Sequence, residues 1–233
     1  MGPDREAIRA AAEQTEVLRP PRQHLATFGL TNVQYYLVTE PSYADLTGEV
    51  RETVVREGQV VVERPQIVTP SYLLNFFQGF DHGREFAEFL MEAHGPHSPG
   101  LLYSYRHELK DTSIVSDPPD VVAGRLVDMV EREGQHLAAV VKGVDHLWDI
   151  SVMKFVHDLT VGSLGKNVQE MAERGLFRSE RGIPQAAHAR IGELFEGVRA
   201  GVVPPSELKA ELDRWGLFEE YQDRFFDLFR RRH

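Results

Sequence analysis

Lys154-Phe-Val-His-Asp-Leu-Thr-Val-Gly-Ser-Leu-Gly-Lys-Asn-Val-Gln-Glu-Met-Ala-Glu-Arg-Gly-Leu-Phe177 is the stretch with the most specific local pattern in this sequence. It predicts one helix, a tight turn at Gly162 and a second helix that ends at Gly175. Two helices set at a steep angle by a short turn with glycine form the helix-turn-helix layout. The second helix would offer DNA four polar side chains, those of Lys166, Asn167, Gln169 and Arg174.

Features of the same stretch disfavour DNA binding. Asp158 takes a first-helix position that usually holds a small residue, and Gly165 weakens the second helix by about 1 kcal/mol relative to alanine. Glu170 and Glu173 offset the basic side chains, and residues 179–184 are too few to form the strand pair of a winged helix. Ordinary packing of helices is therefore the favoured interpretation.

The charge balance also points away from nucleic acid. The chain carries 36 acidic and 26 basic residues, which gives a net charge of −10. A protein that binds many phosphates needs clustered Lys and Arg, because the release of counterions drives that binding. The sequence has one such cluster, at Arg230–Arg232. We therefore expect no nucleic acid partner and no basic membrane-binding surface.

Composition indicates an ordinary globular protein. The chain has 233 residues, of which 42% are hydrophobic and 27% charged, enough to bury a sizeable core. No apolar run approaches the ~18 residues of a membrane span, and the N-terminus lacks the apolar core of a signal peptide. The absence of cysteine excludes disulfides, thiolate metal sites and a cysteine nucleophile. The sequence thus predicts a cytoplasmic protein.

The region between residues 30 and 116 is rich in strand signals. Val33–Thr39 combines β-branched and aromatic residues, as strands do. Glu52–Glu63 predicts a hairpin that turns at Glu57-Gly58, because glycine accepts the positive φ of a two-residue turn. Leu101–Val115 predicts a second hairpin, whereas Leu137–Val141 fits either a strand or a buried helical turn.

The remainder is predominantly helical in pattern. Residues 1–18 suit a short helix, and Tyr72–Ala93 predicts two helices because Gly79 and Gly83 interrupt it. An apolar stripe that includes Leu217, Phe225 and Leu228 predicts a last helix near 217–230. We predict an α+β fold, in which an N-terminal antiparallel sheet of four or five short strands has helices on one face and precedes an all-helical C-terminal region. The predicted divisions are an N-terminal helical arm at 1–22, a mixed α+β region at 23–144 and a helical region at 145–233.

Histidines suggest a candidate metal site. His94-Gly-Pro-His97 places two imidazoles in one loop, and His82, with the carboxylates of Asp81 and Glu92, is near in sequence. Neutral imidazoles and carboxylates suit Zn²⁺ or another divalent ion. The spacing matches no standard zinc motif, so ordinary loop chemistry is the alternative interpretation, and the sequence assigns no cofactor.

A second polar cluster lies in Lys142-Gly-Val-Asp-His-Leu-Trp-Asp149. Lys142 follows an apolar run and could stand at the end of a strand, and Asp145 could orient His146 as a general base. These three residues are the catalytic candidates. In the simpler interpretation Asp145 caps the following helix, Trp148 belongs to the core and the other side chains are solvated.

The sequence therefore leaves three functional hypotheses. The leading one is a non-catalytic protein that acts through protein–protein contacts, as a homo-oligomer, because the common nucleotide-binding and hydrolase motifs are absent and aromatic pairs suit interfaces. The alternatives are a metal-binding or small-molecule enzyme with a site where the sheet meets the helical region, and a transcriptional regulator acting through residues 154–174. The polar residues to examine for the enzyme are His82, His94, His97, Arg106, His107, Lys142, Asp145 and His146.

Overall fold

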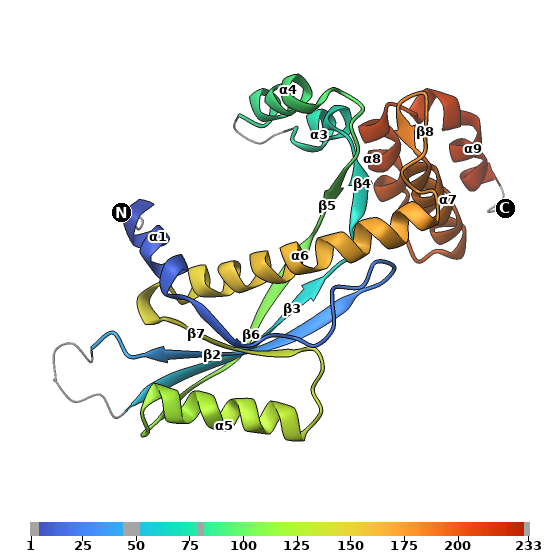
Figure 1. Cartoon of the computed structure of the whole chain (residues 1–233). Coiled ribbons are helices and arrows are strands. Elements are labelled where there is room, and N and C mark those ends of the chain that lie inside the picture. The colour runs from blue at the N-terminus through green and yellow to red at the C-terminus, as the bar shows by residue number, and fades with distance from the viewer. Residues whose placement is uncertain (1–4, 44–51, 79–81, 231–233) are drawn as a thin grey trace. The chain divides into compact units, whose positions relative to one another are not determined.

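The computed structural model describes residues 5–43, 52–78 and 82–230, and these residues fall into two compact units (Figure 1). Unit 1 combines Met1–Arg64 with Tyr103–Gln169, and unit 2 combines Pro65–Leu102 with Glu170–His233. Each unit therefore draws on two separate segments of chain, whereas the sequence suggested three consecutive regions. The fold is an α+β mixture, as predicted.

Unit 1 is built on a mixed five-stranded sheet. Its strand order is β1-β7-β2-β3-β6, and the pairing is antiparallel except between β2 and β7, which run parallel. The prediction of a purely antiparallel sheet was therefore wrong at this pair. The strands are β1 (Glu16–Arg19), β2 (Thr31–Glu40), β3 (Thr53–Val62), β6 (Tyr105–Val115) and β7 (Ala138–Val144).

Helices cover both faces of this sheet, not one face as predicted (Figure 1). Successive side chains of a strand point to opposite faces, so Tyr35 and Leu37 of β2 pack with Phe155 of α6 (Trp148–Glu173). Tyr36 and Val38 pack on the other face, with side chains of α5 (Pro119–Arg132). Because both faces of β2 are buried, its sequence has an almost continuous apolar run. Unit 1 also contains α1 (Arg5–Gln14) and the short η1 (Asp145–Leu147).

Neither predicted hairpin forms: β3 covers the first, and the second is divided between β5 (Gly100–Leu102) and β6. β3 runs straight through Glu57-Gly58, with an irregularity there in its pairing to β6. Gly58 is needed for a different reason, because a Cβ atom at this position would collide with the ring and hydroxyl of Tyr35 on the neighbouring strand. β6 likewise continues through residues 108–111, where the second turn was expected. A glycine required by a cross-strand neighbour and a glycine required by a turn look alike in sequence.

The predicted turn at Gly162 is also wrong, because α6 is continuous there. Ser163 and Asn167 lie one turn apart on its buried face and bind the backbone of the segment before β2. Ser163 Oγ accepts from the amide of Leu25 at 3.0 Å, and Asn167 Nδ2 donates to the Leu25 carbonyl at 2.9 Å. These buried hydrogen bonds hold the helix directly after Gly162, and Phe155 packs on the sheet before it, so contacts on both sides of Gly162 favour a straight helix. The steep angle of a helix-turn-helix is absent.

Unit 2 is mainly helical and has its own core. Two helices come from the first segment, so the predicted break within Tyr72–Ala93 is confirmed, and the predicted helix near 217–230 is confirmed as α9. Glu211 lies at the centre of a buried cluster, where it accepts hydrogen bonds from Tyr72 Oη and Trp215 Nε1, both at 3.1 Å. The elements are β4 (Gln66–Val68), α3 (Pro70–Phe76), α4 (Gly83–His94), β5 (Gly100–Leu102), β8 (Ser179–Glu180), β9 (Ile183–Pro184), α7 (Gln185–Ala200), α8 (Pro205–Trp215) and α9 (Phe218–Arg230).

The described residues include no helix that is both long enough and apolar enough to cross a membrane.

Candidate functional site

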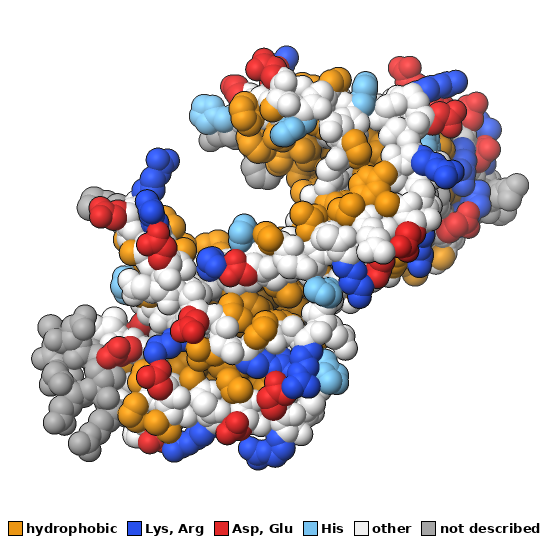
Figure 2. Space-filling model, viewed as in Figure 1, with side chains coloured by type: hydrophobic (Ala, Val, Ile, Leu, Met, Phe, Trp, Pro, Cys, Tyr) orange, Lys and Arg blue, Asp and Glu red, His pale blue; other side chains and the backbone are white. Residues whose placement is uncertain are grey.

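An apolar groove in unit 1 is the best-formed candidate site. It lies between α6 and the strands β3 and β6, and its cavity has a volume of about 520 Å³. In Figure 2, hydrophobic side chains gather just below α6, over the sheet of unit 1. Pockets for small molecules commonly measure about 300–1,000 Å³ and are mostly apolar with a few polar groups. The lining residues are Val60, Tyr105, His107, Trp148, Asp149, Val152, Met153, Val156, His157, Thr160 and Val161.

The polar wall of this groove is held by a hydrogen bond and by ring stacking. Tyr35 Oη and His107 Nε2 are 2.6 Å apart, and the two rings stack with centroids 5.7 Å apart. The ring of Trp148 lies 5.9 Å from His107 on another side. Burial raises the pKa of Tyr35 to about 12, although the positive charge of Arg56 opposes the increase. Tyr35 is therefore a neutral phenol at physiological pH.

Local sequence explains how this wall forms. Gly58 leaves space for the Tyr35 ring over β3, and the register pairs Val60 with His107, so that both side chains lie on the α6 face of the sheet. At the other end of the groove, Tyr105 Oη and Thr160 Oγ1 are 2.6 Å apart, which ties β6 to α6. The groove is thus bounded by fixed contacts at both ends.

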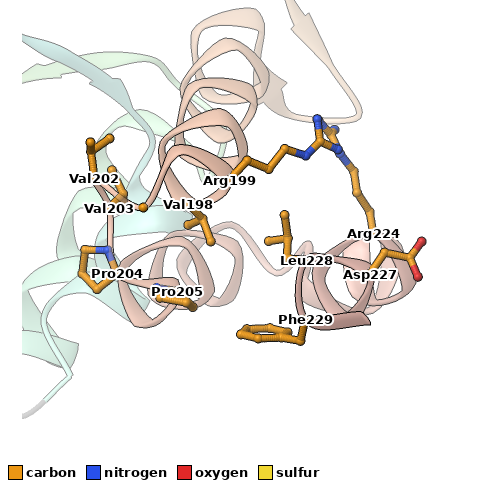
Figure 3. A pocket seen from close by; sticks show the side chains of 11 residues that line it. Val198, Arg199, Val202, Val203, Pro204, Pro205, Arg224, Asp227, Leu228 and Phe229 are labelled. Atoms are coloured by element: carbon orange, nitrogen blue, oxygen red, sulfur yellow. The ribbon is translucent and has the colours of Figure 1, made fainter. Parts of the chain in front are cut away.

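A second cavity, of about 750 Å³, lies within unit 2 (Figure 3). Side chains of α7, α9 and the loop before α8 line it, and most of them are apolar. The exceptions are Arg199, Arg224 and Asp227, of which the two arginines extend toward each other in Figure 3. Sequence reasoning identified none of these residues.

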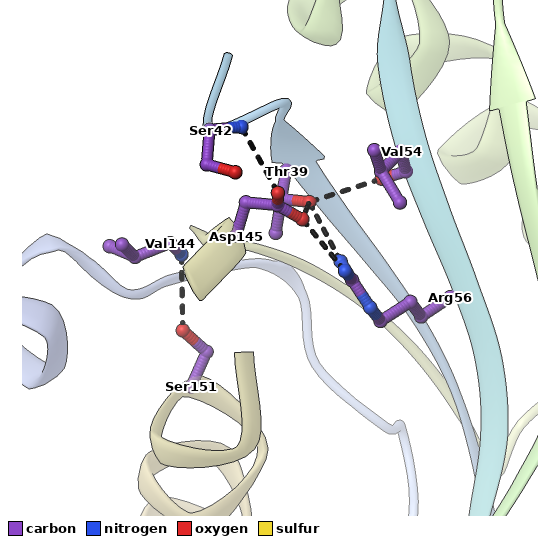
Figure 4. Close-up of polar contacts among 7 residues, drawn as sticks. All are labelled: Thr39, Ser42, Val54, Arg56, Val144, Asp145 and Ser151. Atoms are coloured by element: carbon purple, nitrogen blue, oxygen red, sulfur yellow. Dashed lines mark hydrogen bonds and ion pairs between the residues drawn. The ribbon is translucent and has the colours of Figure 1, made fainter. Parts of the chain in front are cut away.

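The polar network at the end of β7 has one member of the predicted catalytic group (Figure 4). Asp145 Oδ1 accepts from Arg56 Nη2 at 2.7 Å and from Thr39 Oγ1 at 3.1 Å, and Asp145 Oδ2 accepts from the amide of Ser42 at 3.0 Å. The side chains of Arg56 and Asp145 are each 14% exposed. Arg56 also lies 5.5 Å above the ring of Trp148. Asp145 therefore joins β2, β3 and η1 through a paired charge.

The charge state of Asp145 follows from these contacts. Burial acts to raise the pKa of its carboxyl, but the hydrogen bonds from Arg56 and Ser42 outweigh burial and hold the pKa below its ordinary value. The carboxylate is ionised and its oxygens are occupied. Asp145 forms its ion pair with Arg56 and does not orient His146, which is exposed at the next position.

The three catalytic candidates are consequently not brought together as a base and its orienting acid. Lys142 Nζ pairs with Asp120 of α5 at 2.5 Å, while Asp145 faces Arg56 and His146 is exposed. The predicted cap is not observed either, since the hydrogen-bond partners of the Asp145 carboxylate are Arg56, Thr39 and Ser42, none of which belongs to the following helix. The cluster does contribute to the groove, but through Trp148 and Asp149.

The predicted metal ligands are exposed. His82 precedes α4, His94 ends it, and His97 follows in the loop beside Gly182 of unit 2. Asp81 lies outside the described residues. Within residues 5–43, 52–78 and 82–230, no three His, Asp or Glu side chains are grouped to hold a metal ion. The metal site at His94 and His97 stays a prediction.

Of the proposed DNA-contacting residues, Asn167 is fully buried and must be withdrawn. Its Nδ2 also donates to Thr27 Oγ1 at 2.8 Å, and its Oδ1 accepts from Tyr103 Oη at 2.8 Å, so its polar groups are used inside unit 1. Lys166, Gln169 and Arg174 are exposed. Lys166 and Gln169 lie on one uninterrupted helix, and Arg174 directly follows it. A helix-turn-helix instead has a separate first helix, which crosses the DNA backbone.

Sequence reasoning missed the residues that form the groove, apart from His107 and the end of the polar cluster at Trp148 and Asp149. One signal could have found them. Met153, Val161, Leu164 and Val168 repeat at helical spacing on a stripe separate from buried Phe155, and all four are at least 39% exposed. A helix that is apolar on more than one face indicates more than one buried surface.

No family model, curated protein or solved structure matches this chain, so its function must be argued from its own geometry.

Proposed function

We propose that the protein binds a small apolar molecule in the groove of unit 1. The observation that supports this function is the combination of an apolar lining with one anchored polar wall. Val60, Val152 and Val156 provide apolar surface, and His107 is the polar group held by Tyr35 and Trp148. Apolar surface gives affinity, about 25 cal/mol per Å² removed from water. A few fixed polar groups give orientation.

The hydrogen bond of Tyr35 indicates the kind of polar group that the ligand carries. We propose the imidazole tautomer in which the Tyr35 hydroxyl donates to Nε2 of His107, so that the ring carries its proton on Nδ1. That N–H is a donor, so a carbonyl or ether oxygen complements it. Asp149 also lines the groove, and no Lys or Arg does, which disfavours a ligand carboxylate. The ligand class is therefore a neutral apolar molecule with one oxygen acceptor.

A neutral fluorescent probe tests this function. N-phenyl-1-naphthylamine gains fluorescence in an apolar site, and we expect saturable binding to the full-length protein. Met153→Glu places a charge in the groove at a residue that is 57% exposed, so the protein should fold while its affinity for the probe falls at least tenfold, about 1.4 kcal/mol. Displacement by medium-chain aliphatic ketones should exceed displacement by the corresponding carboxylates.

The matched control is Val121→Glu, a similar change at a residue that is 44% exposed on α5, which covers the opposite face of the sheet. It should change the affinity less than twofold. Equal affinities of wild type, Met153→Glu and Val121→Glu would show that the probe does not use the groove, and the proposed function would fail.

We also infer contact between two copies of the chain, through the exposed stripe of α6 that begins at Val161, where the groove ends. Val161, Leu164 and Val168 are 58%, 42% and 39% exposed in successive turns. Gly162 and Gly165 lie among them, and nothing is within 4 Å of either Cβ position, so another backbone can approach closely. A helix face that pairs antiparallel with its own copy about a two-fold axis is self-complementary.

Sedimentation velocity across a concentration series tests the second function. The wild-type chain should sediment as a dimer at high concentration, and Leu164→Glu should shift it to a monomer without loss of helix content. Val121→Glu again serves as the control and should leave the dimer intact. A wild-type monomer at every concentration would contradict this inference but not the ligand-binding groove.

A further inference from the structure

The cavity of unit 2 differs from the groove of unit 1 in its charge. Its floor is apolar, with Val198 and Leu228 pointing into the space in Figure 3. Val203 closes one side, because Gly197 has no Cβ and lets this side chain pack directly on α7. Its ionisable lining residues are two arginines and one aspartate.

The two arginines are held near each other by helix geometry. Arg199 lies four residues after Phe195 on α7, and residues at this spacing are neighbours on one helix face. The guanidinium of Arg224, from α9, lies 4.1 Å from the centroid of the Phe195 ring. Arg224 therefore lies over the Phe195 ring, and Arg199 extends toward it from the other helix in Figure 3.

One of the two arginines has a carboxylate partner. Glu196 Oε1 accepts from Arg199 Nη1 at 2.9 Å, and Asp227 Oδ1 accepts from Arg230 Nη1 at 3.2 Å. The guanidinium of Arg224 lies against an aromatic ring, and no carboxylate accepts from it in the part of the chain that the structure describes. The lining of the cavity thus has two arginines and one aspartate, which gives it a positive charge in a protein whose net charge is −10.

We propose that this cavity binds an amphiphilic anion, with its hydrocarbon or aromatic body over Val198 and Leu228 and its carboxylate or sulfonate between Arg199 and Arg224. A guanidinium presents several N–H donors in one plane and binds two oxygens of one oxyanion through two parallel hydrogen bonds. Bringing an anion between the arginines also removes the repulsion of two like charges. Both arginines are exposed, so salt must weaken the interaction.

A pair of matched probes tests this site. 8-Anilinonaphthalene-1-sulfonate has nearly the same aromatic body as N-phenyl-1-naphthylamine and adds a sulfonate. Titrated into the full-length protein, the sulfonate probe should bind with a dissociation constant that rises at least fivefold between 20 mM and 300 mM NaCl. Arg224→Gln and Arg199→Gln should each raise that constant at least fivefold at low salt, and dodecanoate should displace the probe more effectively than dodecanol.

Arg190→Gln is the matched control, since it removes one positive charge from the same helix at a residue that does not line the cavity. Its affinity for the sulfonate probe should stay within twofold of wild type. Arg224→Lys keeps the charge and loses the planar fork, so it should bind with intermediate affinity. Should Arg224→Gln fail to fold, the exposed Arg199→Gln still gives the answer.

Equal binding of the sulfonate probe by wild type, Arg199→Gln and Arg190→Gln would overturn the proposal. Retention on phosphatidylglycerol vesicles without any binding of dissolved dodecanoate would assign the arginines to a membrane surface and would overturn it as well. Met153→Glu should not alter the sulfonate titration, so this site and the groove of unit 1 can fail independently.

Discussion

At the scale of single residues, Gly58 is where the sequence predicted a turn and the structure has a continuous strand. It supports the groove indirectly, because the Tyr35 ring occupies the space that any Cβ would need. The same ring positions His107 through its hydroxyl. A change at Gly58 must therefore affect both stability and ligand binding.

We expect Gly58→Ala to destabilise the protein by about 1–3 kcal/mol, the usual cost of forcing extra volume into a packed site. Gly124→Ala is the control, because this helical glycine in α5 has nothing within 4 Å of its Cβ position. That change should stabilise the helix by about 0.5–1 kcal/mol. Urea unfolding measures both values. A stabilised Gly58→Ala protein would show that the Tyr35 ring does not occupy this space.

Asp145 should make stability depend on pH. Its pKa is lowered in the folded protein by Arg56 and Ser42 despite burial, so the unfolded chain binds a proton more readily in acid. The contribution is fully present above the unfolded pKa of about 3.9 and is lost as the pH falls through the lower folded value.

We expect Asp145→Asn to cost about 3 kcal/mol at pH 7, since it leaves the largely buried charge of Arg56 without its partner. The difference between wild type and variant should shrink as the pH falls from 5 to 2, as followed by urea unfolding at each pH. A difference that stays constant over this range would show that the ionised carboxylate is not the stabilising species. Asp120→Asn, at an exposed pair, is the control and should cost less than about 1 kcal/mol.

At the scale of elements, α6 determines how unit 1 is organised. One face packs on the sheet, a second face forms the groove, and Ser163 and Asn167 bind the segment before β2. Gly162 and Gly165 therefore lie inside a helix that tertiary contacts hold straight. The helical backbone conformation at Gly162 and Gly165 does not require glycine.

Alanine at Gly162 distinguishes a helix from a turn. In the continuous α6, Gly162→Ala should stabilise the protein by about 0.5–1 kcal/mol, because alanine loses less backbone entropy on folding. Gly175→Ala should instead destabilise it by about 1 kcal/mol, because Gly175 has a φ of +69°. Thermal unfolding of the two variants provides the comparison. Destabilisation by Gly162→Ala would restore the turn that the sequence suggested.

At the scale of the whole molecule, the chain forms two units, each from two segments and each with its own buried core. Leu37 belongs to the core of unit 1 and Leu212 to the core of unit 2, and both are fully buried. Separate cores predict separate unfolding events when the units are not equally stable.

Calorimetry of two matched variants tests this expectation. Leu37→Ala and Leu212→Ala should each cost about 2–5 kcal/mol in the unit that contains the leucine. We expect each to lower a different component of the unfolding endotherm. A single transition that both substitutions lower equally would mean that the two units unfold as one cooperative structure.

The sequence by itself determined much of the local structure. Residue type predicted β2, glycines predicted the break between α3 and α4, and apolar spacing predicted α9, because each of these signals is local to the element. The succession of strand and helix patterns correctly indicated an α+β chain. Of the polar residues to examine, His107 lines the groove.

Only the tertiary structure decided the structural role of the glycines and which side chains are in contact. Gly58 and Gly162 both carry the pattern of a turn, yet one makes room for a ring from the neighbouring strand and the other lies in a helix held by distant backbone groups. The groove joins β3, β6 and α6, and the arginine pair joins α7 and α9. These contacts depend on register and packing between segments that are far apart in the chain, so local sequence patterns do not predict them.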